Sequence, residues 1–222
     1  VEPAVADAIT GDKWNRYIFR TSRNSMQDGL AAASTIKGGG SIAFLAQDYA
    51  FGRDAVKAAK ESLAMVGSKA TVVHEEYAPQ NTTDFTAAAQ RIFEQLKNKP
   101  EPRVLQIVWA GPNPMNKLAD MKPERFGIAL APGGNILPVM KTWKSYAGTQ
   151  GTIFYYYDIP KNKMNDWLVA EHTKRFKAPP DMFTAGGFTA ASAVISALSK
   201  AKSTETEKLI AAMEGLEFET PK

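Results

Sequence analysis

Hydrophobic and polar positions follow two different periods between residues 40 and 158. Short apolar runs bounded by Gly, Pro or Asp predict β-strands, whereas apolar residues at i, i+3 and i+4 predict amphipathic helices. Strands are therefore expected at residues 41–46, 70–77, 103–110, 127–131 and 151–158. Helices are expected between them at residues 53–66, at 85–96 behind a cap at Thr82 or Thr83, at 114–121 and at 136–146.

This alternation predicts an α/β fold with a doubly wound, mostly parallel sheet. Strands separated by a helix of this length are joined by right-handed crossovers, which place helices on both faces of the sheet. After residue 158 the pattern becomes helical, at residues 165–177, 187–200 and 204–213, with one strand fragment at 216–219. Because three helices without a sheet have nothing to cover, this part is expected to be an incomplete second unit.

Ligands of open parallel sheets bind at the carboxyl ends of the strands. That edge is aromatic and mostly uncharged here, which favours a flat or apolar ligand held by a few polar groups. Trp109 either contacts ligand or belongs to the core, and two of the three tyrosines at 155–157 are expected to pack inside. The candidate ligand-binding residues at this edge are Tyr49, Trp109, Ala110, Gly111, Gly133, Gly134 and Tyr157.

Composition excludes several other classes of function. The 222 residues are 44% hydrophobic and 23% charged, as in ordinary globular proteins, and contain no cysteine. The net charge of +4 comes from scattered basic residues, so no nucleic acid partner is expected. His74 and His172 lack ligand spacing and Gly38–Gly40 precedes a strand, so neither a metal nor a cofactor is expected. The apolar stretch at 185–197 is shorter than the about 20 residues of a membrane helix.

Four short motifs, read together, carry a resemblance to a known family. They are Tyr17–Thr21, Asp48–Gly52, Thr83–Phe85 and Pro180–Thr184. In this order they resemble the type I periplasmic binding proteins, specifically the branched-chain amino-acid-type solute-binding proteins of ABC importers. The resemblance implies a periplasmic, non-enzymatic protein of two hinged lobes, which closes on a small molecule and delivers it to the importer permease. Its only link to the membrane would be that permease.

The resemblance also divides the chain. Residues 1–19 match the end of the first lobe and the approach to the hinge, residues 20–158 the second lobe, and residues 159–222 part of the first lobe. Both ends look cut by this comparison, since the first-lobe loops that grip a ligand carboxylate are missing. Phe183 joins the candidate ligand-binding residues on the same basis.

One departure from the family bears on the ligand. Amino-acid-binding members carry an acidic residue for the α-ammonium at the position matched here by Gly133, and often Asp where this chain has Asn24. A buried ammonium without its carboxylate costs several kcal/mol. The expected ligand is therefore a small carboxylate without an amine, with aromatic ones favoured, and a branched-chain amino acid or amide is the alternative.

Two other classes of function stay open at this point. An α/β enzyme would need a base or nucleophile at the strand-end edge, where Asp48 and Asp158 supply the carboxylates. The effector-binding domain of a transcription regulator shares the same architecture. A DNA-binding segment ahead of the chain would favour the regulator, and a signal peptide would exclude it.

Overall fold

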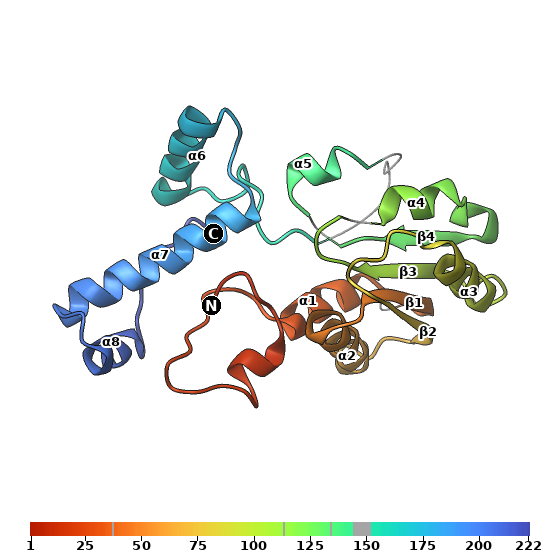
Figure 1. Ribbon diagram of the computed structural model, residues 1–222, viewed down its shortest axis with the longest axis horizontal. Helices are drawn as coiled ribbons and strands as arrows, with labels where there is room; N and C mark the ends of the chain where they lie inside the picture. The colour runs from red at the N-terminus through yellow and green to blue at the C-terminus, as the bar shows by residue number, and fades with distance from the viewer. Residues whose placement is uncertain (37, 113, 134, 144–151) are drawn as a thin grey trace. The chain divides into compact units, whose positions relative to one another are not determined.

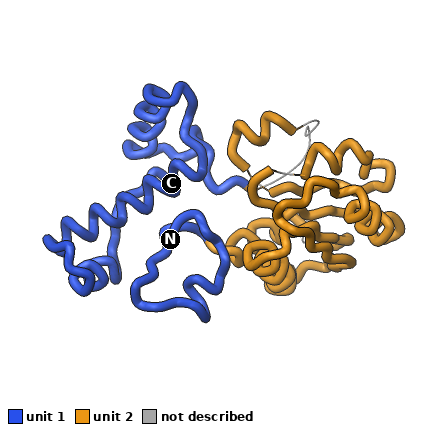
Figure 2. The backbone as a smooth tube through the Cα atoms, in the orientation of Figure 1, with its two compact units in different colours: residues 1–23, 153–222 blue, residues 24–152 orange. Residues whose placement is uncertain are grey.

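The computed structural model describes residues 1–222 except 37, 113, 134 and 144–151. The chain forms two compact units, shown in different colours in Figure 2. Unit 1 contains residues 1–23 and 153–222, and unit 2 contains residues 24–152. A compact unit need not be a whole lobe, so the lobe boundaries expected after residues 19 and 158 remain a prediction.

Unit 2 is built on a parallel sheet of four strands among the described residues (Figure 1). The strands run in the order β2-β1-β3-β4 and all pair in parallel. This confirms the predicted α/β fold with a mostly parallel sheet. The strand bounds are β1 Gly40–Gln47, β2 Ala70–Ala78, β3 Arg103–Val108 and β4 Ile128–Ala131.

Helices cover both faces of this sheet. They are α1 Ser25–Ala33, α2 Ala50–Met65, α3 Thr86–Leu96, α4 Met115–Asp120 and α5 Leu137–Met140, with 3-10 turns η2 Ser34–Ile36 and η3 Pro123–Phe126. Ala43 and Leu45 of β1 join a core with α3 and α4, whereas Ile42 and Phe44 join a core with α1 and α2. Because successive side chains of a strand point to opposite faces, β1 contributes to both cores.

Helix α1 was not expected from the sequence. Its cap is Asn24, whose Oδ1 accepts from Gln27 N at 2.9 Å while Gln27 Oε1 accepts from Asn24 N at 3.0 Å. The face that α1 buries consists of the small residues Ser25, Gly29 and Ala33. Such a face gives little hydrophobic periodicity, although the Asn-x-x-Gln spacing is a capping-box signal.

Other element boundaries also differ from expectation. Helix α3 begins at Thr86, and the side chain that binds its first turn is Asp84, whose Oδ1 accepts from Thr86 N at 2.9 Å. The expected cap at Thr82 or Thr83 is therefore wrong. Within the expected helix at 136–146, the structure has α5, and residues 144–146 lie outside the described residues.

The expected fifth strand, at residues 151–158, is wrong for its described part, because residues 152–158 are irregular. They belong to unit 1 from residue 153 onward. There Asn165 Nδ2 donates to Tyr157 O at 2.8 Å and to Pro160 O at 3.0 Å, and the Tyr155 hydroxyl donates to Asn165 Oδ1 at 2.6 Å. The segment is thus bound to a helix rather than to a neighbouring strand.

Unit 1 is helical in its described residues. Its elements are η1 Asp7–Thr10, α6 Lys163–Phe176, α7 Met182–Ala201 and α8 Thr206–Met213, and the strand fragment expected at 216–219 is irregular. The Arg20 guanidinium organises the N-terminal segment by donating to Ala4 O at 2.8 Å, Ala6 O at 2.7 Å and Thr10 Oγ1 at 3.0 Å.

Helix α7 is apolar and 20 residues long, so by length and composition it could cross a membrane. The expectation that every apolar stretch is too short to cross a membrane is therefore wrong for α7. A single helix of this kind is only a weak indication of a span, because core helices of soluble proteins have the same length and composition. Ala185, Thr189, Ala193 and Ala197 are buried four residues apart and form the packed face of α7.

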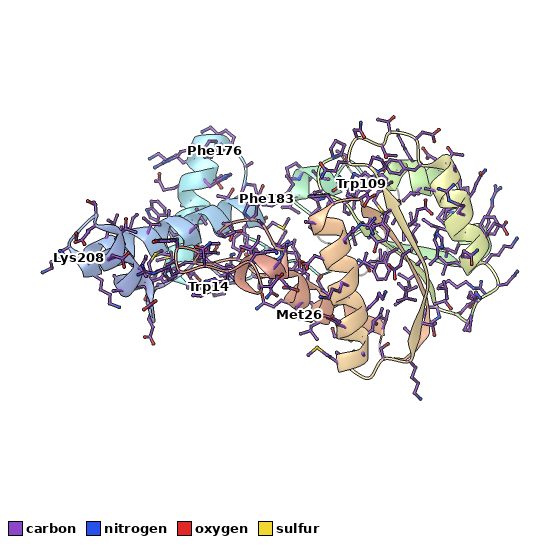
Figure 3. The ribbon with its side chains drawn as sticks, turned by 60° about the horizontal axis from the view of Figure 1, so that its bottom comes forward. Trp14, Met26, Trp109, Phe176, Phe183 and Lys208 are labelled. Atoms are coloured by element: carbon purple, nitrogen blue, oxygen red, sulfur yellow. The ribbon has the colours of Figure 1, made fainter. Side chains whose placement is uncertain are left out.

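Unit 1 exposes large apolar side chains on its helices. Trp167, Phe176, Phe183 and Ile195 are exposed, and Figure 3 labels Phe176 and Phe183. We expect residues 1–222, expressed alone, to self-associate or to be cleaved beyond Pro160, because large apolar side chains gathered on the surface of a monomer favour association. Limited proteolysis with size-exclusion chromatography measures both effects. Unit 2 should be the protected fragment, and a protease-resistant monomer of the whole chain would contradict the expectation.

Gly52 is required by the contact between α2 and the end of β1. A Cβ at this position would lie 2.0 Å from Gln47 O. We expect Gly52→Ala to lower the free energy of unfolding of unit 2 by at least about 2 kcal/mol through overpacking. The matched control is Gly187→Ala in α7, where a Cβ meets no atom within 4 Å. That change should stabilise its helix by about 0.5–1 kcal/mol. Urea unfolding compares the two variants, and equal effects would contradict the assignment.

Candidate functional site

The carboxyl edge of the sheet in unit 2 is the candidate site. Strands β1 and β3 lie side by side in the sheet, and both end at this edge. Gln47, the last residue of β1, is 3% exposed. Its Nε2 donates to Ala110 O at 3.0 Å, and its Oε1 accepts from Ala110 N at 2.9 Å. One side chain therefore ties the end of β1 to the loop that follows β3.

The end of β2 is hydrogen-bonded to the residue that follows β1. Asp48 N donates to Ala78 O at 2.8 Å. The Asp48 carboxylate accepts from Arg53 Nε at 2.8 Å and lies 2.7 Å from Arg53 Nη2. The Arg53 guanidinium in turn lies 4.2 Å from the centroid of the Tyr77 ring. Burial and the neighbouring Glu75 raise the pKa of Tyr77 to about 12.

Tyr49 starts α2 at the open side of this edge. It occupies the N-cap position and its side chain is 37% exposed. Its ring centroid lies 5.8 Å from that of Phe51, and partial burial raises the pKa of its hydroxyl. An exposed aromatic ring at a strand end can contact a ligand, so the structure leaves Tyr49 available for the predicted role.

The small residues at the edge leave open backbone. Ala110 and Gly111 are exposed, and Gly133 is half-buried. Gly111 has φ +83° and Gly133 has φ +68°, and a Cβ at either position would meet no atom within 4 Å. Glycine is therefore favoured at both positions by backbone conformation rather than by crowding. Gly134, the remaining candidate here, lies outside the described residues.

Trp109 belongs to the core of unit 2 (Figure 3). It is 7% exposed, and its ring meets Phe85 edge-on with centroids 5.1 Å apart and an interplanar angle of 82°. Met115 and Leu118 of α4 belong to the same core. Of the two roles left open by the sequence, the structure supports packing. Trp109 anchors the start of the loop that carries Ala110 and Gly111.

The other two candidate residues lie in unit 1. Tyr157 is half-buried, and its ring centroid lies 4.7 Å from that of Tyr156. Phe183 is 46% exposed in the first turn of α7, where Asp181 Oδ1 accepts from Phe183 N and Thr184 N, each at 2.9 Å. Tyr155 is the packed tyrosine of the run, at 5% exposure, and burial, followed by the charge of Asp181, raises its pKa to about 12.

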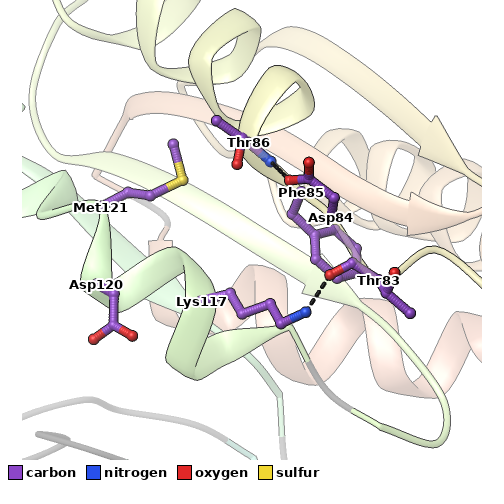
Figure 4. Close-up of a pocket in the computed structure, with 7 residues that line it drawn as sticks. All are labelled: Thr83, Asp84, Phe85, Thr86, Lys117, Asp120 and Met121. Carbon is purple, nitrogen blue, oxygen red and sulfur yellow. Dashed lines mark hydrogen bonds between the residues drawn. The ribbon is translucent and has the colours of Figure 1, made fainter.

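A pocket between the start of α3 and α4 was missed by sequence reasoning (Figure 4). Its volume is about 370 Å³. Lys117 Nζ donates to Thr83 O across it, and the Thr86 N–H lowers the pKa of Asp84 by bonding its carboxylate. The lining residues are Thr83, Asp84, Phe85, Thr86, Lys117, Asp120 and Met121. The motif Thr83–Phe85 lines this pocket, but in the sequence it indicated the family and not a pocket.

Glu76 of β2 has two side-chain partners in unit 2. His74 Nε2 lies 3.0 Å from Glu76 Oε2, which also accepts from Arg91 Nε at 3.2 Å. The Arg91 contact, more than the histidine, lowers the pKa of Glu76. Among the described residues, no group of three His, Asp or Glu is placed to hold a metal ion.

The arrangement defines a class of fold: a parallel α/β unit with helices on both faces of its sheet, whose strand-end edge exposes an aromatic ring and loop backbone. Comparison with protein families gives a match to the family described as "Periplasmic binding protein", over residues 3–222. The chain belongs to this periplasmic binding protein family. The resemblance drawn from the four short motifs is thereby confirmed.

Solved structures support the same assignment. A protein from Rhodopseudomonas palustris, described as an ABC-type branched-chain amino acid transporter, is 61% identical over 99% of this chain and 59% of its own, with a TM-score of 0.82. A second R. palustris solute-binding protein, solved with 3,4-dihydroxybenzoic acid, is 25% identical over 98% of this chain and 60% of its own, with a TM-score of 0.76.

A periplasmic binding protein from Burkholderia mallei shares the fold at 20% identity, over 98% of this chain and 57% of its own, with a TM-score of 0.83. The chain thus spans about three fifths of the length of these solved relatives. The comparison with curated proteins gives no match.

The packed position of Trp109 leads to a test of its role. We expect Trp109→Ala to lower the free energy of unfolding of unit 2 by about 3–5 kcal/mol, as for other buried aromatic deletions. Trp14→Ala is the control, because Trp14 is 55% exposed. Chemical denaturation followed by circular dichroism measures both. An unchanged unfolding midpoint in Trp109→Ala, together with weaker ligand binding, would instead make Trp109 a binding residue.

Proposed function

We propose that this chain belongs to an extracytoplasmic solute-binding protein that captures a small organic ligand and delivers it to an ABC importer. The observation that carries this proposal is the open carboxyl edge of the parallel sheet in a chain of the periplasmic binding protein family. Edge residues Tyr49, Ala110, Gly111 and Gly133 would contact the ligand from unit 2. Tyr157 and Phe183 would do so from unit 1.

Capture would occur by hinge closure of two lobes, without covalent chemistry. The chain changes from one unit to the other at residues 23–24 and again at 152–153, which gives it two crossing segments. Beside these crossings, the Arg23 guanidinium lies 3.7 Å from the centroid of the Phe154 ring. A cation–π contact of this kind would hold the two segments together as one hinge.

The contacts of Asp48, at the sheet edge, and of Asp158, in unit 1, disfavour the enzyme alternative. Asp48 is paired with Arg53, and Asp158 Oδ1 lies 3.0 Å from Lys161 Nζ. Each carboxylate is thus in contact with a cation rather than with a side chain that could act as a nucleophile. The match of the chain to solute-binding proteins across residues 3–222 favours transport over the effector domain of a regulator.

The proposed ligand is a small carboxylate without an amine, and an aromatic one is favoured. Gly133 stands where amino-acid-binding members of the resembling family carry the acid for the α-ammonium, and its φ of +68° is one that side-chain-bearing residues rarely adopt. The 25% identical relative solved with 3,4-dihydroxybenzoic acid supports the same class. A branched-chain amino acid is the second candidate, favoured by the description of the 61% identical relative.

A thermal-shift panel on the full-length protein separates the two candidates. We expect larger stabilisation by benzoate and 3,4-dihydroxybenzoate than by leucine at equal concentrations, because the stabilisation of the native state grows with the logarithm of ligand concentration divided by Kd. Benzamide is the control for the carboxylate charge and should give the smaller shift. A larger shift with leucine than with any amine-free acid would contradict the proposed ligand class.

A matched pair of variants tests the position itself. Asp and Asn both tolerate a positive φ and differ in charge. Gly133→Asp should therefore increase the response to leucine, and Gly133→Asn should not. Equal responses of the two variants in the same assay would show that residue 133 does not face the ammonium.

A further inference from the structure

Gln47 is a buried polar side chain in the middle of the candidate site. It ends β1, the strand that pairs with both β2 and β3. At 3% exposure its amide is withdrawn from water, which costs several kcal/mol unless hydrogen bonds replace the lost ones. Both ends of the amide find their partner in the backbone of one residue, Ala110, at 3.0 and 2.9 Å.

This pairing determines the orientation of the Ala110 backbone. The amide of Gln47 mimics a peptide group, so it binds the N–H and the C=O of Ala110 as a neighbouring strand would. Strand β3 itself ends at Val108, so the bonds of Gln47 extend the ordered backbone beyond the last residue of the strand. Ala110 and the following Gly111 are exposed, so the backbone that Gln47 holds lies at the surface.

The position of Gln47 is itself constrained. Gly52 lies so close that a Cβ there would come within 2.0 Å of Gln47 O, and that same oxygen accepts from Tyr49 N at 2.9 Å. The backbone of Gln47 is therefore packed against the first turn of α2. The held backbone fixes where the side chain starts, and its burial and its two bonds to Ala110 fix its direction.

We propose that Gln47 is a positioning residue, which sets the backbone of Ala110 and Gly111 in the conformation that receives the ligand. It acts through this loop and does not touch the ligand. The inference rests on the proposed function, because it takes the carboxyl edge of the sheet as the ligand site. It adds a residue whose effect on affinity is indirect.

The Gln47→Glu variant gives a pH-dependent test. A protonated carboxyl group donates and accepts like the amide, whereas the ionised form accepts from Ala110 N but cannot donate to Ala110 O. Affinity for benzoate and for leucine, measured by calorimetry on the full-length protein, should be at least about tenfold weaker than wild type at pH 8. It should recover to within about threefold of wild type at pH 5.5, because burial at residue 47 disfavours the ionised carboxylate and raises the pKa of the introduced group above its ordinary value of about 4.3.

Gln106→Glu is the matched control, because Gln106 is a half-buried glutamine on β3. Measured over the same pH range, this variant and the wild type report any pH dependence that does not come from the introduced group at residue 47. An affinity of Gln47→Glu that follows these controls at every pH would overturn the proposal. Affinity that falls at pH 8 and stays low at pH 5.5 would also overturn it, since restored bonding should restore the loop.

Hydrogen exchange of the Ala110 amide tests the same proposal without a ligand. Gln47→Met removes both bonds and keeps the side-chain length, so exchange at Ala110 should be at least about tenfold faster than in wild type, with the strand amides of β1 unchanged. Equal protection at Ala110 would overturn the proposal. If neither benzoate nor leucine binds the wild type, the proposed ligand class fails and this measurement decides on Gln47 alone. Failure of both Gln47 variants to fold would assign the residue to stability and overturn the positioning role.

Discussion

The burial of strand β1 is the constraint on which the rest of unit 2 depends. Every residue from Ser41 to Gln47 is buried, so both faces of the strand must be covered and both of its edges paired. Helices α1 and α2 supply one face, and α3 with α4 the other. The side chains of such a strand reach the surface only beyond its carboxyl end, where Tyr49 follows it and where the loop after β3 is held by Gln47. The location of the candidate site follows from this burial.

The sequence allowed the parallel sheet to be predicted because its strands are short apolar runs separated by amphipathic helices. It misled at residues 152–158, where tyrosines with high strand propensity are instead bound through Asn165. The bonds to Asn165 outweigh the strand propensity of the tyrosines. Because Asn165 lies outside the segment, the local sequence pattern gives no sign of these bonds. Helix α1 was missed for the opposite reason, since Ser25, Gly29 and Ala33 bury a face that carries almost no hydrophobic signal.

The candidate site was predicted as a set of strand ends rather than as a set of contacts. The rule that ligands bind at the carboxyl edge was enough to select Tyr49, Ala110 and Gly111. The same rule did not distinguish Trp109 from residues at the surface, although Trp109 packs against Phe85 in the core. Nor did it reveal the link between Gln47 and Ala110, because that bond joins residues 63 positions apart. Long-range polar pairing of this kind becomes visible only once the strands are placed.

Fewer residues decide which ligand is bound than decide the fold. A relative with 61% identity keeps the same architecture, and so does one with 20%, so the scaffold tolerates extensive substitution. Charge selection, by contrast, depends on single positions. At Gly133 the backbone has φ +68°, and a carboxylate for an ammonium would have to be carried by a residue in that uncommon conformation. Such strain costs of order 1 kcal/mol or more, whereas an unpaired buried ammonium costs several. If residue 133 faces the ligand as proposed, a member selected for amino acids would gain by carrying the acid despite the strain, and a glycine there fits the proposed ligand without an ammonium.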